Sequence, residues 1–274
     1  MNDFNRYLLA KRTIDDRALN RYVWQRLQTE VARLGRPLHL LEVGAGVGTM
    51  VERLVEWGLL SDGDYTAVDA NPDCIANARR RLGERHATID LIWQTADLFD
   101  FAAQAQPRRW DLLIAHALLD LLDLSQALPL LFNLLKPGGL FYFTLNFDGG
   151  TIFQPSLPGD RAVEQAYHQT MDSRPGGSQT GRRLFHQVQQ AGGKVLALGS
   201  SDWVVHPVGS TYPADEAFFL HFILDTMAGA LNSHPDLDSD QLQNWLRQRR
   251  SQVEAGQLVY IAHQLDMVGV VRST

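Results

Sequence analysis

Three glycines follow an apolar stretch early in the chain, within the segment LLEVGAGVGTM at residues 40–50. Gly44, Gly46 and Gly48 stand where a buried strand would turn into a helix, and glycine allows both a sharp turn and close approach of a ligand. Their G-x-G-x-G spacing differs from the G-x-G-x-x-G pattern of a dinucleotide pyrophosphate site. Glu42, two residues before the first glycine, would repel a pyrophosphate and attract a cation. The segment therefore predicts a site for a cationic ligand.

Two acidic residues follow the next two expected strands. Asp69 ends the segment DYTAVD, where a carboxylate can accept hydrogen bonds from both hydroxyls of a ribose. Asp97 lies in TADLFDF, just past the third strand, where it can accept from an adenine amino group. Each residue alone can equally be a cap or a solvated acid. Their position relative to the glycine loop favours a nucleoside site.

Further polar residues follow the fourth and fifth expected strands. His116 ends the segment WDLLIAH, where a neutral imidazole can take a proton from a substrate hydroxyl or amine, or can simply pack beside a cofactor. Asn146 and Asp148, at the end of LFYFTLN and just beyond it, are expected to face the same crevice and to contact substrate. The remaining histidines and Cys74 have no metal-ligand spacing, so no metal site is expected.

The elements that must position these residues alternate regularly from Leu38 onward, which predicts an α/β fold with a doubly wound, mostly parallel sheet. In such sheets, ligands bind at the carboxyl ends of the strands, where the candidate residues stand. The expected strands are 38–43, 64–69, 88–93, 111–115, 140–146, 194–200 and 258–265.

One domain is expected over residues 1–274. Its parts are an N-terminal helical segment at 1–36, an α/β core at 38–200, a helical insertion at 202–257 and a last strand at 258–266.

Three segments are candidates to enclose the ligands. Residues 148–177 are rich in glycine, proline and serine and are expected to form a long loop that acts as a lid. The apolar stretch FFLHFILDTMAGAL, within residues 214–254, is expected to pack on the core and to wall an acceptor pocket. In the N-terminal segment, Tyr7, Arg12 and Arg17 are candidates to close over the ligand.

Composition restricts the possible partners. With 45% hydrophobic and 20% charged residues, the chain is an ordinary globular protein. A net charge of -6 argues against a nucleic-acid partner, which usually needs a basic face. The single cysteine rules out an internal disulfide framework, and neither a signal peptide nor a membrane-spanning run is expected. A cytoplasmic protein without a membrane partner is expected, and its oligomeric state is left open.

Five segments, EVGAGVG, VDANP, ADLF, WDLLIAH and LKPGG, occur in the order found in class I S-adenosylmethionine-dependent methyltransferases, and residues 38–146 resemble that family. The resemblance implies a Rossmann-like sheet of seven strands with the last antiparallel, and S-adenosylmethionine as cofactor. It implies cofactor-binding roles for Glu42, Gly44, Ala45, Gly46, Asp69, Ala70, Asp97, Leu98, Ala115 and His116. Asp120 stands where many relatives carry a histidine, so the base is unassigned, with His116 as the candidate.

The expected function is methyl transfer to an oxygen, nitrogen or carbon of a small molecule. The residues AHALLD after the fourth strand differ from the N/D-P-P-Y/F sequence of enzymes that methylate flipped bases. A nicotinamide-dependent enzyme is disfavoured by the glycine spacing and Glu42. A catalytically silent protein that binds the cofactor or its product, and a protein or RNA methyltransferase, remain alternatives.

Overall fold

The computed structural model describes residues 2–86 and 88–272. Its strands form one sheet in the order β3-β4-β2-β1-β5-β6-β9-β7, with β8 paired to β9. The parallel strands are β1 (Leu38–Val43), β2 (Gly63–Asp69), β4 (Ile89–Thr95), β5 (Trp110–His116) and β6 (Leu135–Gln154). Strand order reverses between β1 and β5, and such a switch point opens a crevice at the carboxyl ends of the strands.

The other end of the sheet is antiparallel. Strand β9 (Val259–Val271) pairs antiparallel with both β6 and β7 (Gly193–Ser200). This arrangement confirms the expected mostly parallel sheet with an antiparallel last strand. Within the described residues, the sheet also includes two short strands that the sequence did not predict, β3 (Arg85–His86) and β8 (Trp203–Val205).

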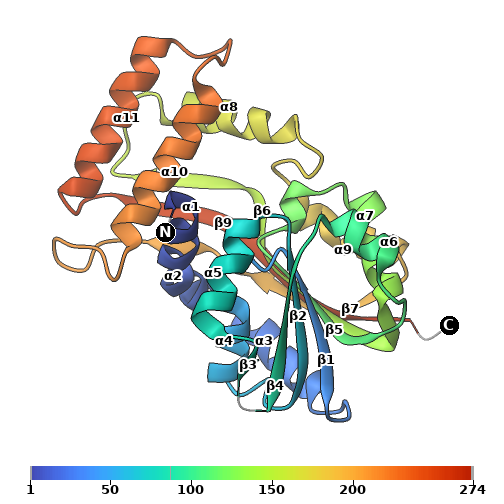
Figure 1. Ribbon diagram of the computed structural model, residues 1–274. Helices are drawn as coiled ribbons and strands as arrows, with labels where there is room; N and C mark the ends of the chain where they lie inside the picture. The colour runs from blue at the N-terminus through green and yellow to red at the C-terminus, as the bar shows by residue number, and fades with distance from the viewer. Residues whose placement is uncertain (1, 87, 273–274) are drawn as a thin grey trace.

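Helices cover both faces of the sheet (Figure 1). One face carries α3 (Arg21–Val31), α4 (Thr49–Glu56) and α5 (Pro72–Leu82), and the other carries α6 (Leu98–Gln104), α7 (Leu124–Leu134) and α9 (Thr180–Gln190). Each face has its own cluster of buried apolar side chains, as strands buried on both sides require.

A third group of helices lies beyond the carboxyl ends of the parallel strands (Figure 1). Its members are α1 (Asp3–Ala10), α2 (Arg12–Ala18), α8 (Asp160–Asp172), α10 (Glu216–Leu231) and α11 (Ser239–Glu254). They share a core with the distal parts of β6 and β9, which includes Phe147, Trp203, Phe219 and Tyr260. No helix in the described ranges combines the length and the apolar character needed to cross a membrane.

The structure corrects the expectation of a long loop over residues 148–177. Strand β6 continues to Gln154, where it pairs with Val259, and α8 follows. Two of the glycines that suggested a loop, Gly149 and Gly150, lie at an irregularity of this strand, because the pairing register with β9 shifts between Phe147 and Gly150. Glycine within a strand commonly marks such a bulge. Most of the segment is therefore strand and helix rather than loop.

Candidate functional site

The glycine loop joins the carboxyl end of β1 to α4. Gly44 and Gly46 have φ angles of 70° and 53°, in the left-handed region that glycine adopts without strain. A Cβ atom on Gly44 would lie 2.8 Å from a methyl carbon of Leu118, and one on Gly46 would lie 3.1 Å from Leu8. The local geometry therefore requires glycine at Gly44 and favours it at Gly46.

A cavity of about 440 Å³ opens above this loop, in the size range of small-molecule sites. Nine of the ten predicted cofactor residues line it, namely Glu42, Gly44, Ala45, Gly46, Asp69, Ala70, Asp97, Leu98 and His116. The tenth, Ala115, is buried beneath it in β5 and does not reach its surface. Residues from four strand ends and the segments after them thus meet in one place.

Glu42 carries a buried carboxyl group on the cavity wall. The residue is 1% exposed, and its Oε2 atom accepts a hydrogen bond of 2.7 Å from the hydroxyl of Tyr65. Burial raises the pKa of Glu42 to about 8, although the Tyr65 hydrogen bond and the positive charge of Arg53 act in the opposite direction. A carboxyl group held this way gains most when a cation enters the cavity.

Asp69 fastens the end of β2 to the glycine loop. Its Oδ2 atom accepts from the backbone N–H of Gly46, and its Oδ1 atom accepts from that of Asn71, both at 2.8 Å. Because a carboxylate has about four acceptor positions, capacity remains for the two hydroxyls of a ribose.

Asp97 has a structural role as the N-cap of α6. Its Oδ1 atom accepts from the backbone N–H of Phe99 at 2.8 Å. The side chain is also part of the cavity wall, so capping and ligand contact are compatible at this position.

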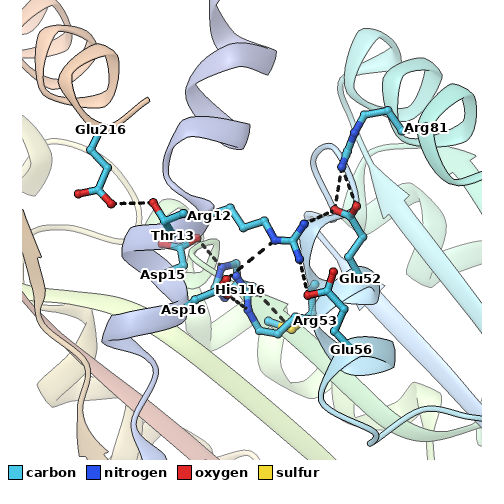
Figure 2. Close-up of polar contacts among 11 residues, drawn as sticks. Arg12, Thr13, Asp15, Asp16, Glu52, Arg53, Glu56, Arg81, His116 and Glu216 are labelled. Atoms are coloured by element: carbon cyan, nitrogen blue, oxygen red, sulfur yellow. Dashed lines mark hydrogen bonds and ion pairs between the residues drawn. The ribbon is translucent and has the colours of Figure 1, made fainter. Parts of the chain in front are cut away.

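His116 is buried, and both ring nitrogens have partners. Nδ1 lies 2.7 Å from the Thr144 hydroxyl. Nε2 lies 3.0 Å from Oδ2 of Asp15 (Figure 2). Burial opposes ionisation of Asp15, but Lys11 and His116 together hold its pKa well below the usual value. Burial lowers the pKa of His116 to about 4, so the ring is neutral at pH 7.

The N-terminal helices close this first cavity from above. Phe4, Leu8 and Lys11 line it, at a spacing that places them on one side of α1. From the sequence, Tyr7, Arg12 and Arg17 are the candidates for this role instead. The intervals of four and three residues between Phe4, Leu8 and Lys11 are the signal in the sequence that these three share one side of a helix.

The three residues chosen from the sequence have other places. Tyr7 lines a different cavity. Arg12 pairs with Glu56 at 2.6 Å, which joins α2 to α4, and Arg17 pairs with Glu216 of α10 at 2.7 Å (Figure 2 shows Arg12, Glu56 and Glu216). The arginines therefore hold the N-terminal helices in place from the outside.

A second cavity of about 340 Å³ adjoins the first beneath α10. Five residues line both cavities, which are Phe4, Leu8, Lys11, Ala117 and Leu121. The helical segment predicted to wall an acceptor pocket contributes Phe222, Ile223 and Thr226 to the second cavity. Asp120, in the 3-10 turn Leu119–Leu121 after β5, also lines it.

Comparisons with known proteins agree with this geometry. Residues 40–139 match a family model described as a methyltransferase domain. Part of the compactin nonaketide synthase of Penicillium citrinum is 29% identical over 121 residues, which cover 43% of this chain and 4% of the synthase. The chain thus corresponds to a small part of that curated relative.

Solved structures share the fold across almost the whole chain at low identity. A methyltransferase-like protein of Bacillus halodurans C-125 has a TM-score of 0.53 and 13% identity, with 89% of this chain and 97% of that chain covered. A chain from the complex of the Haloferax volcanii Trm112 methyltransferase activator with a methyltransferase has a TM-score of 0.51, 16% identity and coverage of 99% and 97%. The cyclopropane synthase MmaA2 of Mycobacterium tuberculosis has a TM-score of 0.50, 12% identity and coverage of 97% and 94%.

Residues 40–139 therefore form a methyltransferase domain, in agreement with the resemblance of residues 38–146 to the class I S-adenosylmethionine-dependent methyltransferases. The residues of this domain fit the cofactor of that family. S-adenosylmethionine carries two positive charges, and the buried Glu42 provides a carboxyl group on the cavity wall that a cation would favour in its ionised form. At the glycine loop a side chain would meet Leu118 or Leu8, so that backbone atoms alone face the ligand.

Two predicted substrate residues of the methyltransferase lie elsewhere. Asn146 and Asp148 line neither cavity. The Asn146 side chain donates to the carbonyl oxygen of Leu265 at 2.9 Å, and Oδ1 of Asp148 accepts from Nε of Arg182 at 2.9 Å. Their neighbours Leu145 and Phe147 reach the second cavity, because side chains alternate along β6.

Proposed function

We propose that this methyltransferase moves a methyl group from S-adenosylmethionine to a small molecule held in the second cavity. The observation that carries the proposal is the wall shared by the two cavities, at Lys11, Ala117 and Leu121 among others. A cofactor in the first cavity and an acceptor in the second would meet at this wall. The enclosure by α1 and α10 suits a small molecule better than a segment of protein or RNA.

The residues that line the first cavity suit different parts of the cofactor. Glu42 would hold the ammonium group of the methionine part. Asp69 would accept hydrogen bonds from the ribose hydroxyls, and Asp97 from the adenine amino group. Leu98 and Ala70 would pack against the adenosine. His116 would lie near the sulfonium with its ring held by Asp15 and Thr144.

When bound, S-adenosylmethionine supplies a methyl group that is already electrophilic, because it is attached to a sulfonium. The protein then contributes in-line placement of the acceptor and exclusion of water. Placement alone can contribute about 7–11 kcal/mol to lowering the barrier. The apolar residues around the shared wall, from α1 and from the turn after β5, would provide that exclusion once both ligands cover them.

The test incubates the purified chain with methyl-labelled S-adenosylmethionine and, in parallel, a metabolite extract, a protein extract and total RNA. Label in the small-molecule fraction is expected. Gly46→Val should abolish it, because a β-branched side chain would occupy cofactor space near Leu8. Gly229→Val in α10 is the matched control, since a Cβ atom there would have no atom of another segment within 4 Å.

The other outcomes identify the alternatives. Label confined to protein or RNA would overturn the small-molecule proposal. Cofactor binding by calorimetry without label in any fraction would indicate a catalytically silent protein that binds the cofactor or its product.

A further inference from the structure

Lys11 places a buried positive charge where the two cavities meet. The residue is 5% exposed and lines both cavities. Its Nζ atom lies 3.2 Å from Oδ2 of Asp15, which also accepts from His116, while Oδ1 of Asp15 accepts from Trp203 at 2.9 Å. Asp15 therefore divides its charge among three donors. Because an ammonium group has three N–H donors, one ion pair leaves Lys11 with donors for a ligand at the shared wall.

Asp120 places a carboxyl group beside that charge. It stands between Leu119 and Leu121, and Leu121 lines both cavities. Its Oδ1 atom is enclosed and has no hydrogen-bond partner among the described residues. Leaving a buried polar atom without a partner costs free energy, so a donor supplied by a ligand would be favoured here.

The groups around Asp120 come from four segments. Lys11 faces it from the junction of α1 and α2, Tyr7 from α1, and Tyr167 from α8, while Arg174 lines the same cavity just after α8. Burial raises the pKa of Asp120 to about 6, against the opposing effects of its own backbone N–H and of Lys11. Burial, with a smaller contribution from Asp120, raises the pKa values of both tyrosines, so the tyrosines stay neutral. At pH 7 Asp120 is therefore mostly a free base.

We propose that the acceptor reacts as an oxyanion, from a phenol or from the enol of a carbonyl compound, with Asp120 removing its proton and Lys11 binding the anionic oxygen. This inference rests on the proposed methyl transfer and narrows its acceptor. The O–H bond, or the C–H bond next to the carbonyl, breaks as Asp120 takes the proton. The electron pair of the oxygen or of the enolate carbon forms the bond to the methyl carbon, and the carbon–sulfur pair leaves with sulfur as a neutral thioether. Asp120 then releases the proton to water.

The same charges disfavour an amine acceptor. Methylation of an amine forms an ammonium ion, which would appear next to Lys11 at the shared wall. Like charges this close in a low-dielectric site repel strongly. An oxyanion is neutralised by Lys11 and consumed in the reaction, so no such repulsion develops.

The first test measures the preferred nucleophile with probes of matched shape. The purified chain and labelled S-adenosylmethionine are offered 2-naphthol, 2-naphthylamine and benzoylacetone separately, and the linkage of any label in metabolite extract is found by mass spectrometry. We expect transfer to naphthol or to the diketone, at least tenfold above the amine. Naphthol would indicate a phenolate and the diketone an enolate.

The outcomes separate this inference from the proposed function. Label found mainly on nitrogen, in a probe or in the extract, would overturn the proposal that the acceptor reacts as an oxyanion. It would leave the proposed methyl transfer to a small molecule unaffected. If no probe reacts, label on oxygen or carbon of an extract product supports the inference. Label in no small molecule would overturn both.

A second test requires no turnover. The chain saturated with S-adenosylhomocysteine is titrated with 4-nitrophenol, whose anion absorbs visible light and whose neutral form does not. We expect the bound probe to ionise at lower pH than the free probe. Lys11→Met should abolish this shift, Lys11→Arg should restore part of it, and Lys194→Met on β7 is the matched control. Absence of binding, or a bound probe that ionises at higher pH, would contradict the role of Lys11.

The role of Asp120 has its own readout in the pH profile. Activity toward the accepted probe or extract product should rise with pH through about 6 as Asp120 ionises. Asp120→Asn should lower kcat/KM at least tenfold and remove this limb, whereas Asp225→Asn on the exposed side of α10 should leave it. If Asp120→Asn lowers activity by the same factor at every pH, so that activity still rises through pH 6, Asp120 is not the base.

Discussion

The Nε2 atom of His116 lies 3.0 Å from Oδ2 of Asp15, a contact that connects the floor of the cofactor cavity to helix α2 (Figure 2). Because Asp15 is ionised, it can only accept, so Nε2 carries the proton and Nδ1 accepts from Thr144. The ring then has no lone pair for a substrate proton. His116, the base candidate from the sequence, is in our view a positioning residue.

The first prediction follows from this contact. His116→Gln should reduce stability by about 1–3 kcal/mol through lost buried hydrogen bonds and should leave the shape of the pH–rate profile unchanged. The folded-state pKa of about 4 lies below the unfolded value, so the unfolded chain binds more protons between these pH values. The stability that neutral His116 provides is present above the unfolded pKa and is lost as pH falls toward 4.

Urea unfolding at pH 5 and pH 7 checks this prediction. The stability difference between the two pH values should be smaller in His116→Gln than in the parent, while His206→Gln, at an exposed position, should behave as the parent. Loss of a limb of the pH–rate profile in His116→Gln would instead indicate a base.

The cofactor side of the site could be predicted because its determinants are local in the sequence. The glycine loop, Asp69 and Asp97 each follow a strand directly, and a doubly wound sheet brings strand ends together without further information. Lys11 and Asp15 could not be found in this way, because the Asp15–His116 contact spans 101 positions of sequence. The helical spacing places Lys11 on the same side as Phe4 and Leu8, but nothing in the sequence shows that this side lies where two cavities meet.

The register of β6 explains why two predicted substrate residues do not line the second cavity. Asn146 and Asp148 follow the correct strand, but the pairing of β6 with β9 shifts between Phe143 and Asn146, and Leu145 has a positive φ of 55°. A shift of one residue exchanges the two faces of a strand. Counting alternation from the start of the strand therefore does not predict which residues face the second cavity, and it is Leu145 that lines it.

The second prediction concerns protons released on cofactor binding. Glu42 has a pKa near 8 in the free protein, and a cation beside it would favour the ionised form. Binding of S-adenosylmethionine below pH 8 should release a proton, and affinity should rise as pH increases toward 8. Calorimetry in two buffers of different ionisation enthalpy measures the release directly, and an equal heat in both buffers would remove Glu42 from the ammonium site.

Glu42 should also make stability depend on pH in the opposite direction to most acidic residues, whose folded-state pKa is lowered. Its folded-state pKa lies above the unfolded value, so the folded chain binds the extra proton and stability falls as pH rises from about 4.5 to about 8. Glu42→Gln should therefore be more stable than the parent at pH 8 without cofactor, and should bind the cofactor at least tenfold more weakly. Glu84→Gln, an exposed control, should change neither quantity.

The third prediction concerns Asp69, which holds Gly46 and Asn71 through their backbone N–H groups. Asp69→Asn should weaken binding of S-adenosylmethionine by tenfold or more, because hydrogen bonds to a charged group contribute about 1.5–3 kcal/mol each. Isothermal titration gives the affinity, and circular dichroism checks that the variant is folded. Asp73→Asn, an exposed residue at the start of α5, is the control, and unchanged affinity in folded Asp69→Asn would exclude the ribose contact.

The last prediction is that Glu216 holds the N-terminal helices over both cavities. Its carboxylate is fully buried at the start of α10 and accepts from the Thr13 hydroxyl and from Arg17, each at 2.7 Å. Glu216→Gln removes the charge that binds Arg17, so α1 and α2 should detach more often and expose their backbone to protease. Limited proteolysis should cut the variant within its first 20 residues at least several-fold faster than the parent. Bound S-adenosylhomocysteine should slow the cleavage, because α1 contributes Phe4 and Leu8 to the cofactor cavity. The control is Asp225→Asn, at an exposed residue that lies on α10 like Glu216 and pairs with Arg250 of α11. This change should leave the rate of cleavage unchanged. Equal cleavage of Glu216→Gln and its parent would mean that the ion pair does not control access to the site.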